Sequence, residues 1–329
     1  MTRRSILISA VLPALLLIAA TAATAQPTTA ASSAPIHRLT PESSFEEGCF
    51  DPCMCVVHFY DRLAGTMRLV PAPPEPGFVV QEVRDVNWIV PGLDWWVTGS
   101  GTYRLGGQPL MQRLELDLVV DGRDVQHFDS GLVLADPAQP GIAITISMNN
   151  LVCHDTVFHV AARPIVMQEI APYALFRSSY QEGCFGPCDC AVASWPLSGR
   201  FGLLKLAEGA TGADFAVLDF KGLVRETLAT TAGAGWPVEG VGIYRIGAPA
   251  RDQRLRLALV EDGRAAVRFD SGAVPGDGDL KRIDIDVAAD GFACYDRVYS
   301  LHARRRPPAV MTFQMIAPDP APRTVAPAP

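Results

Sequence analysis

The sequence predicts an all-β protein of two tandem homologous antiparallel domains, each a disulfide-bridged sandwich or barrel of about 7–8 strands. Three observations support this fold class. The segment SSFEEGCFDPCMC at 43–55 returns as SSYQEGCFGPCDC at 178–190. Short segments of alternating apolar and polar residues are separated by turn residues, which is typical of strands with one buried face. The eight cysteines form two groups of four with the same spacing.

The repeat continues to the end of each half. GTYRLGG at 101–107 corresponds to GIYRIGA at 242–248, and CHDTV at 153–157 corresponds to CYDRV at 294–298. A repeat of this length is a whole domain. We therefore expect a signal peptide at 1–25, a flexible leader at 26–40, a first β domain at 41–172, a second at 173–318, and a Pro/Ala-rich tail at 319–329.

The first 25 residues have the pattern of an export signal. Arg3 and Arg4 precede an apolar stretch, and Ala23-Thr24-Ala25 forms an A-x-A cleavage site. The arginine pair partly resembles a twin-arginine signal, whereas the strongly apolar run favours the general secretory route, so both routes stay open. No later segment is long and apolar enough to span a membrane. The sequence therefore predicts a secreted or periplasmic protein with no stable membrane span after the signal is removed.

Strands are expected in the same order in both copies. In the first copy they are Cys53–Phe59, Phe78–Val90, Leu114–Val120, Ile142–Met148 and Asp155–Ala161. Leu255–Leu259 and Ile283–Val287 repeat the third and fourth of them. Asp121-Gly122 and Asp262-Gly263 predict type I′ hairpin turns, because glycine accepts the positive φ that this turn needs.

Each cysteine group has the spacing C-x3-C-x-C followed by a fourth cysteine about a hundred residues later, which indicates disulfides in an exported protein. A Cys53–Cys55 bridge is disfavoured because a C-x-C ring is strained. Two pairings remain: Cys49–Cys53 with Cys55–Cys153, or Cys49–Cys55 with Cys53–Cys153. The second copy presents the same choice with Cys184, Cys188, Cys190 and Cys294.

A soft metal site at the first cysteine cluster is the alternative, because Met54 and His58 lie beside the thiols. The second copy has Asp189 and Ala193 at these two positions, so only the cysteines are shared. We therefore predict no metal and no cofactor. With 28 basic and 35 acidic residues and no basic stripe, the chain is not expected to bind nucleic acid.

The FDSG segments at 128–131 and 269–272 offer a carboxylate beside a hydroxyl in both copies. We interpret them as turns and ion pairs, since Asp and Ser before Gly commonly bond nearby backbone amides. The residues concerned are Asp129, Ser130, Asp270 and Ser271, with Arg104, Arg113, Arg245 and Arg254 as candidate partners.

Candidate binding residues are acids beside the cysteines and tryptophans at matching places. A bridge between the first cluster and the last cysteine would bring Glu47 near Asp155, and Glu182 near Asp296, as a carboxylate pair for acid–base chemistry or calcium. Solvated surface acids are the simpler interpretation. Trp95-Trp96 and Trp236 are expected to pack in the domain, although adjacent residues in a strand face opposite sides and one of the pair is then open to a ligand.

The block G-x-Y-R-x-G, Q-R-L, D-G-R, F-D-S-G and C-x-D resembles stretches in uncharacterised secreted bacterial proteins with a duplicated Cys-containing β domain. This resemblance covers most of each copy, implies no activity and brings no functional residues with it.

The chain contains no nucleophile elbow, zinc-protease, P-loop or dinucleotide motif. We therefore expect a secreted, non-catalytic binding or structural module of the bacterial cell envelope, whose partner is an unidentified glycan or protein. Two alternatives are a glycan- or ester-acting hydrolase that uses Glu47 and Asp155, and a carrier of apolar ligands inside a barrel. The sequence fixes neither the ligand nor the oligomeric state.

Overall fold

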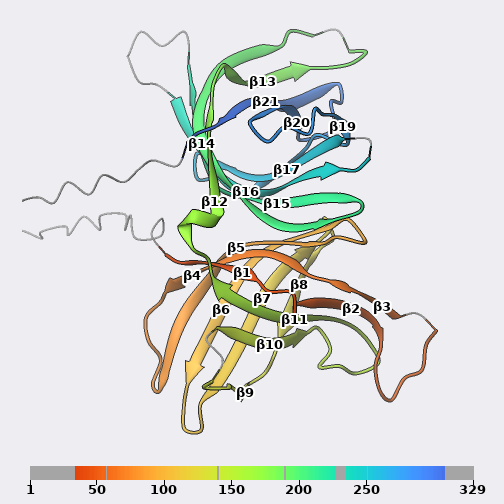
Figure 1. Ribbon diagram of the computed structural model, residues 1–329, viewed down its shortest axis with the longest axis vertical. Coiled ribbons are helices and arrows are strands. Elements are labelled where there is room, and N and C mark those ends of the chain that lie inside the picture. The colour runs from red at the N-terminus through yellow and green to blue at the C-terminus, as the bar shows by residue number, and fades with distance from the viewer. Residues whose placement is uncertain are drawn as a thin grey trace, which may run out of the picture. The chain divides into compact units, whose positions relative to one another are not determined.

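The computed structural model describes residues 34–56, 58–138, 141–188, 190–226, 235–249 and 251–307. They form two antiparallel sheets, drawn from red to green and from green to blue in Figure 1. The first sheet contains β1 (Ile36–Leu39), β2 (Ser44–Cys49), β3 (His58–Arg62), β4 (Ala64–Pro71), β5 (Phe78–Val90), β6 (Trp95–Gly106), β7 (Met111–Val120), β8 (Val125–Asp129), β9 (Val133–Leu134), β10 (Ile142–Ser147) and β11 (His154–Pro164).

A 3-10 turn, η2 (Met167–Glu169), leads into the second sheet. That sheet contains β12 (Ile170–Leu175), β13 (Ser178–Cys184), β14 (Ala193–Gly209), β15 (Gly212–Arg225), β16 (Gly235–Gly247), β17 (Asp252–Glu261), β18 (Val267–Asp270), β19 (Val274–Pro275), β20 (Arg282–Ala288) and β21 (Tyr295–Arg305). The predicted all-β antiparallel class is confirmed. No helix within the described ranges is long and apolar enough to cross a membrane.

Each sheet closes on itself. In the first, consecutive strands pair as β4-β5-β6-β7-β8-β10-β11, and β1 pairs with both β4 and β11. In the second, β12 likewise pairs with both β14 and β21. Pairing of the first strand with both neighbours closes the ladder in the way that a barrel does.

We call each closed sheet a ring. The first strand of each ring is interrupted at a serine, which divides it into two shorter strands. β1 and β2 pair with successive parts of β11, and between them the Ser43 hydroxyl donates to Ala161 O at 2.8 Å and accepts from Ala161 N at 3.0 Å. Ser178 makes the same two contacts with His302 in the second sheet. Each break adds one strand to its sheet, and the two-residue strands β9 and β19 add one more to each.

Two segments differ from the expectations. β1 lies inside 26–40, which was expected to be a flexible leader, and β12 begins at Ile170 rather than at Tyr173. The burial of β1 alternates, but its sequence Ile-His-Arg-Leu does not alternate apolar and polar residues, because the polar His37 is buried. In Cys53–Phe59, strand begins only at His58, because Cys53 and Cys55 lie in a loop that the disulfides hold. The predicted signal peptide and tail lie outside the described residues.

The interior of each ring is packed with aromatic rings. The Phe158 ring lies 5.0 Å from Phe128 and 5.8 Å from Trp88, centroid to centroid, and all three side chains are fully buried. Tyr299 replaces Phe158 in the second ring, where its hydroxyl donates to the buried Glu261 carboxylate at 2.6 Å. Side-chain packing therefore fills the middle of both rings.

The alternation expected in Leu114–Val120 is confirmed. Leu114, Leu116 and Leu118 are fully buried, whereas Asp117 is exposed. The turn that follows has positive φ at both central residues, 48° at Asp121 and 76° at Gly122, and Arg123 N donates to Val120 O. Positive φ at both positions defines the predicted type I′ turn. The second copy repeats it at Asp262 and Gly263.

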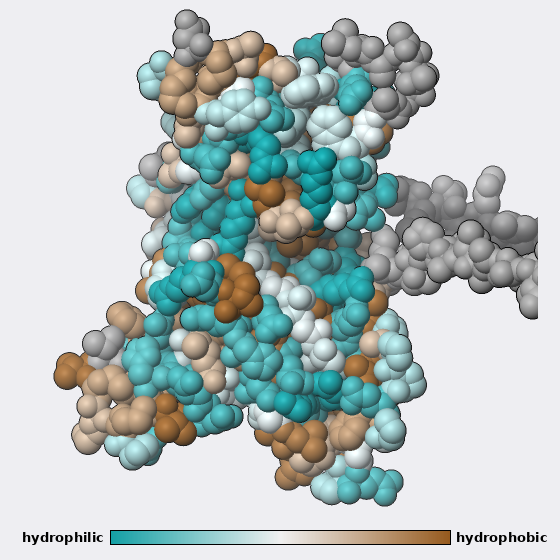
Figure 2. Space-filling model, turned by 180° about the vertical axis from the view of Figure 1, so that it is seen from behind, coloured by the Kyte–Doolittle hydropathy of each residue, from teal (hydrophilic) through white to brown (hydrophobic). Residues whose placement is uncertain are grey.

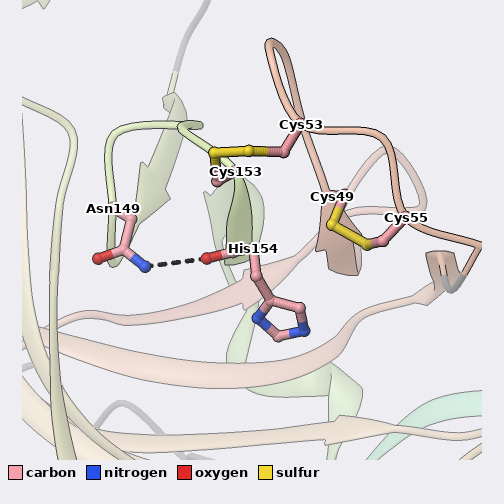
Figure 3. The surroundings of a disulfide bond; sticks show 6 residues. All are labelled: Cys49, Cys53, Cys55, Asn149, Cys153 and His154. Carbon is pink, nitrogen blue, oxygen red and sulfur yellow. Dashed lines mark hydrogen bonds between the residues drawn. A yellow bond between two sulfur atoms is a disulfide. The ribbon is translucent and has the colours of Figure 1, made fainter.

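Each ring has two disulfides, which join loops at one of its ends. Cys49 pairs with Cys55, and Cys53 pairs with Cys153 (Figure 3), which is the second of the two predicted pairings. The other copy has Cys184–Cys190 and Cys188–Cys294. In both copies the longer bridge therefore links the loop after the first strand to the loop before the last one.

The two sheets lie in one unit of the chain and share a polar contact. Asp94, in the turn between β5 and β6, accepts hydrogen bonds from Arg245 at 2.7 Å, Arg254 at 2.5 Å and Arg256 at 3.0 Å. Arg256 also donates to the backbone oxygen of Asp94 at 2.9 Å. Three cations around one carboxylate form a network, which contributes more than an isolated surface pair.

The two classes of disulfide should contribute unequally to stability. Removing Cys53–Cys153, with a separation of 100 residues, should cost about 4–5 kcal/mol in the chain-entropy model, and removing Cys49–Cys55, with a separation of 6, about half as much. Urea unfolding of C53S/C153S and C49S/C55S checks this. Equal losses would show that loop length is not what matters here.

Candidate functional site

The structure does not bring the predicted carboxylate pairs together. Glu47 lies opposite Thr156 and Asp155 lies opposite Gly48 in the β2–β11 ladder. Because paired residues share a face and neighbours in a strand alternate, the Glu47 and Asp155 side chains leave opposite faces of the sheet. The register of Glu182 and Asp296 is the same in the second copy. The spacing needed for two-carboxylate chemistry is therefore not formed.

Asp155 and Asp296 each hold a loop through four backbone amides. Asp155 is buried and accepts N–H bonds from Met148, Asn149, Leu151 and Thr156 at 2.7–3.0 Å. Asp296 accepts the four equivalent bonds, from Ala289, Asp290, Phe292 and Arg297. A carboxylate whose acceptor positions are occupied in this way fixes the turn before the last strand.

The FDSG segments form the expected turns and ion pairs. Arg113 binds Asp129 with two nitrogens, at 3.0 and 2.7 Å, and the Ser130 hydroxyl accepts from Leu114 N. Arg254, Asp270 and Ser271 repeat these contacts in the second copy. The Arg113 hydrogen bond lowers the pKa of the Asp129 carboxyl. Burial acts to raise the pKa of Asp270, but Arg254 and the Gly272 amide more than offset it, and this pKa is also lowered.

The other two predicted arginines differ between the copies. Arg104 binds Glu75 and Glu115 within its own sheet. Arg245 binds Asp214 at 2.6 Å and also reaches Asp94 of the first copy. One repeated position therefore serves a single sheet in one copy and the contact between sheets in the other.

All three candidate tryptophans contact other side chains, although Trp95 and Trp236 are only half-buried. Trp95 packs against the core beneath the Arg123 guanidinium, which lies 4.3 Å from its ring centroid. Trp96 faces the other side of the strand and is buried, where its Nε1–H donates to Asn87 at 2.9 Å. Trp236 packs edge-on against Tyr180. These contacts indicate packing rather than ligand stacking.

An opening in the first sheet lies between β8 and β10. β10 pairs with β11 along its whole length, but with β8 only through Ser147 and Asp129. Gln112 bridges the gap from β7: its amide nitrogen donates to Ala143 O at 2.9 Å, and its oxygen accepts from Tyr103 at 3.1 Å. Burial raises the pKa of the Tyr103 phenol, which therefore remains protonated and able to donate.

A hollow of about 600 Å³ lies over this opening. Its polar lining comes from carboxylate, hydroxyl, amide and imidazole groups, namely Glu42, Gln112, Asp129, Ser130, Thr145, Ser147, Asn150 and His159. Its apolar lining comes from Val133, Leu134, Ile144, Leu151 and Val160. We call this hollow the β10 groove. A concave surface with apolar walls and a few convergent polar groups is the usual form of a binding site.

A hydrogen-bonded row of three side chains forms one wall of the β10 groove and continues behind it. His159 Nδ1 lies 2.8 Å from Thr145 Oγ1, and its Nε2 lies 3.0 Å from Glu46 Oε1. In a neutral imidazole that donates from Nε2, Nδ1 accepts the threonine hydroxyl proton. The Thr145 oxygen then keeps its lone pairs for a ligand. The second copy has Gln181, Asp286 and Ser300 at these places.

Sequence reasoning missed the β10 groove. Gln112 and Gln253 occupy the same position in both copies, and Gln253 likewise donates to Asp284 O at 3.0 Å. The shared glutamine was therefore a detectable signal. The row Glu46–His159–Thr145 left no such signal, since its members are 113 and 14 residues apart and only one copy has them.

Comparison of the chain with protein-family models, curated proteins and solved structures finds no match. Among the described residues, no group of three or more His, Cys, Asp or Glu side chains is arranged to hold a metal ion.

Replacing Asp155 with asparagine should lower the free energy of unfolding by about 3 kcal/mol, because an amide group would face backbone donors that need an acceptor. Asp296→Asn should cost a similar amount. Asp117→Asn, at an exposed position, should change little and serves as the control. Chemical unfolding measures all three, and near-equal stabilities would refute the loop-holding role.

Stability should also depend on Asp129 and Asp270 at low pH. Both pKa values are lowered from 3.8, so the stabilisation is present above that value and disappears as the pH falls through the lower folded pKa. The unfolding free energy of the wild type should therefore fall more steeply below pH 4 than that of D129N/D270N. Parallel pH profiles would contradict this.

Proposed function

We propose that this chain is an exported, non-catalytic binding protein of the cell envelope, and that its first domain binds an envelope glycan or protein in the β10 groove. The observation that carries the proposal is the hollow itself, which both polar groups and apolar side chains line. A signal-like N-terminus supports export, and four disulfides support an oxidising compartment.

The repeat separates scaffold from binding surface. Contacts present in both copies, such as those of Asp155 and Asp296, hold loops and turns. In the β10 groove, Gln112 and Ser130 recur as Gln253 and Ser271. Thr145 and His159 differ, because they correspond to Asp286 and Ser300. A duplicated fold that keeps its framework and changes the side chains of one copy fits recognition by that copy.

The two alternatives receive less support from the geometry. A hydrolase using Glu47 and Asp155 needs both acids on one face, and they lie on opposite faces. A carrier of apolar ligands needs space inside the ring, where Trp88, Phe128 and Phe158 are packed together.

The proposal is tested by screening the purified protein against glycans, peptidoglycan fragments and envelope proteins, with calorimetric titration of each binder. T145A/H159A should weaken binding at least tenfold, because it removes two polar groups from the groove wall. D286A/S300A, the same positions in the second copy, should leave the affinity unchanged. Equal losses in the two variants, or turnover of a ligand by the wild type, would overturn the proposal.

A further inference from the structure

The edge of β10 that faces the groove has no strand partner from Ile142 to Ile146 in the described part of the chain. Ala143 O points into the opening, because it accepts the Gln112 amide. The N–H and C=O groups of one strand residue point the same way, and this direction alternates along the strand. The Ala143 N–H and both backbone groups of Thr145 therefore face the groove.

Apolar side chains border the same edge. Leu132, Val133 and Leu134 are exposed beside β10 on the stretch that includes β9, and Leu151 is exposed on the loop after β10. Figure 2 shows that hydrophilic residues predominate on the face it draws, with hydrophobic residues in separate patches. An extended segment lying along β10 would thus meet backbone partners on one side and apolar contacts on the other.

The second copy has the same opening but a different edge. β20 pairs with β18 only through Ala288 and Asp270. Asp284 and Asp286 stand where the first copy has Ala143 and Thr145. Charged side chains on an exposed strand edge are a common protection against the pairing of another strand. The open edge of β20 therefore carries two acidic residues that disfavour strand pairing, whereas the open edge of β10 carries none at the same positions.

From this contrast, and on the basis of the proposed binding function, we propose that the open edge of β10 accepts an extended peptide as an added antiparallel strand. Backbone hydrogen bonds to Ala143 and Thr145 supply the affinity, and the apolar residues beside β9 select side chains at alternate positions of the peptide. The ligand is thus an extended polypeptide segment of a partner protein, not a glycan.

The probe is the peptide Lys-Thr-Val-Thr-Val-Thr-Val-Lys, because a backbone-driven mode does not need a matched sequence. Titration into the full chain should show saturable binding with one site per chain. Hydrogen exchange followed by NMR should show at least tenfold slower exchange of the Ala143 and Thr145 amides on saturation, with no change at Asp284 and Asp286. No binding up to millimolar peptide, or binding without slower exchange at these amides, would overturn the inference.

Exchanging the edge residues Asp284 and Asp286 with Ala143 and Thr145 makes the test specific. A143D/T145D should weaken peptide binding at least tenfold. V79D/V166D, which adds the same two charges at exposed positions outside the groove, should retain it within threefold. D284A/D286T should raise the stoichiometry from one site to two. Equal binding by all variants would overturn strand addition.

The outcome also separates this inference from the function on which it rests. A glycan or a folded protein that binds the groove, while the peptide does not, removes strand addition and leaves the proposed binding function standing. If D286A/S300A weakens peptide binding and T145A/H159A does not, the peptide binds the second copy. That result would refute both strand addition at β10 and the proposed function of the β10 groove.

Discussion

Each ring depends on the antiparallel pairing of its last strand with its first. β11 pairs with β1 and β2, and β21 pairs with β12 and β13, so segments more than a hundred residues apart are brought side by side. Loop-closure entropy opposes pairing over such separations. The bridges Cys53–Cys153 and Cys188–Cys294 reduce this cost at the end where the pairing begins. The same register places Glu47 and Asp155 on opposite faces, so closure decides which chemistry the acids can perform.

Side-chain contacts that recur in both copies mark the framework. Arg113 with Asp129, Ser43 with Ala161, and Asp155 with its four amides all return in the second copy at matching positions. The contacts that change include those of Thr145 and His159 beside the opening at β10, and also those of Arg245, which binds Asp94 of the other sheet. A duplication thus provides an internal comparison within one chain, in which identical contacts indicate folding and altered ones indicate a separate role.

Local pattern was sufficient to predict the class of fold, the repeat and several of the longer strands. Alternation in Leu114–Val120 and the Asp121-Gly122 turn depend on neighbours in sequence, and both were predicted. The sequence narrowed the disulfides to two pairings but could not choose, because the choice depends on where Cys53 and Cys153 meet in space. The opening beside β10 was not predictable either. It results from the absence of pairing between β8 and most of β10, which no single segment reveals.

The ion-pair cluster around Asp94 is one of several contacts between the sheets, beside Arg68 with Asp219 and Asn87 with Gly242. Asp94 of the first copy is met by Arg245, Arg254 and Arg256 of the second. The position that corresponds to Asp94 in the second copy is Gly235, and the one that corresponds to Arg256 in the first copy is Glu115. A head-to-tail contact that could repeat would build open-ended filaments. Asp94 and its full set of cations each occur in a single copy, so this cluster gives no template for polymerisation.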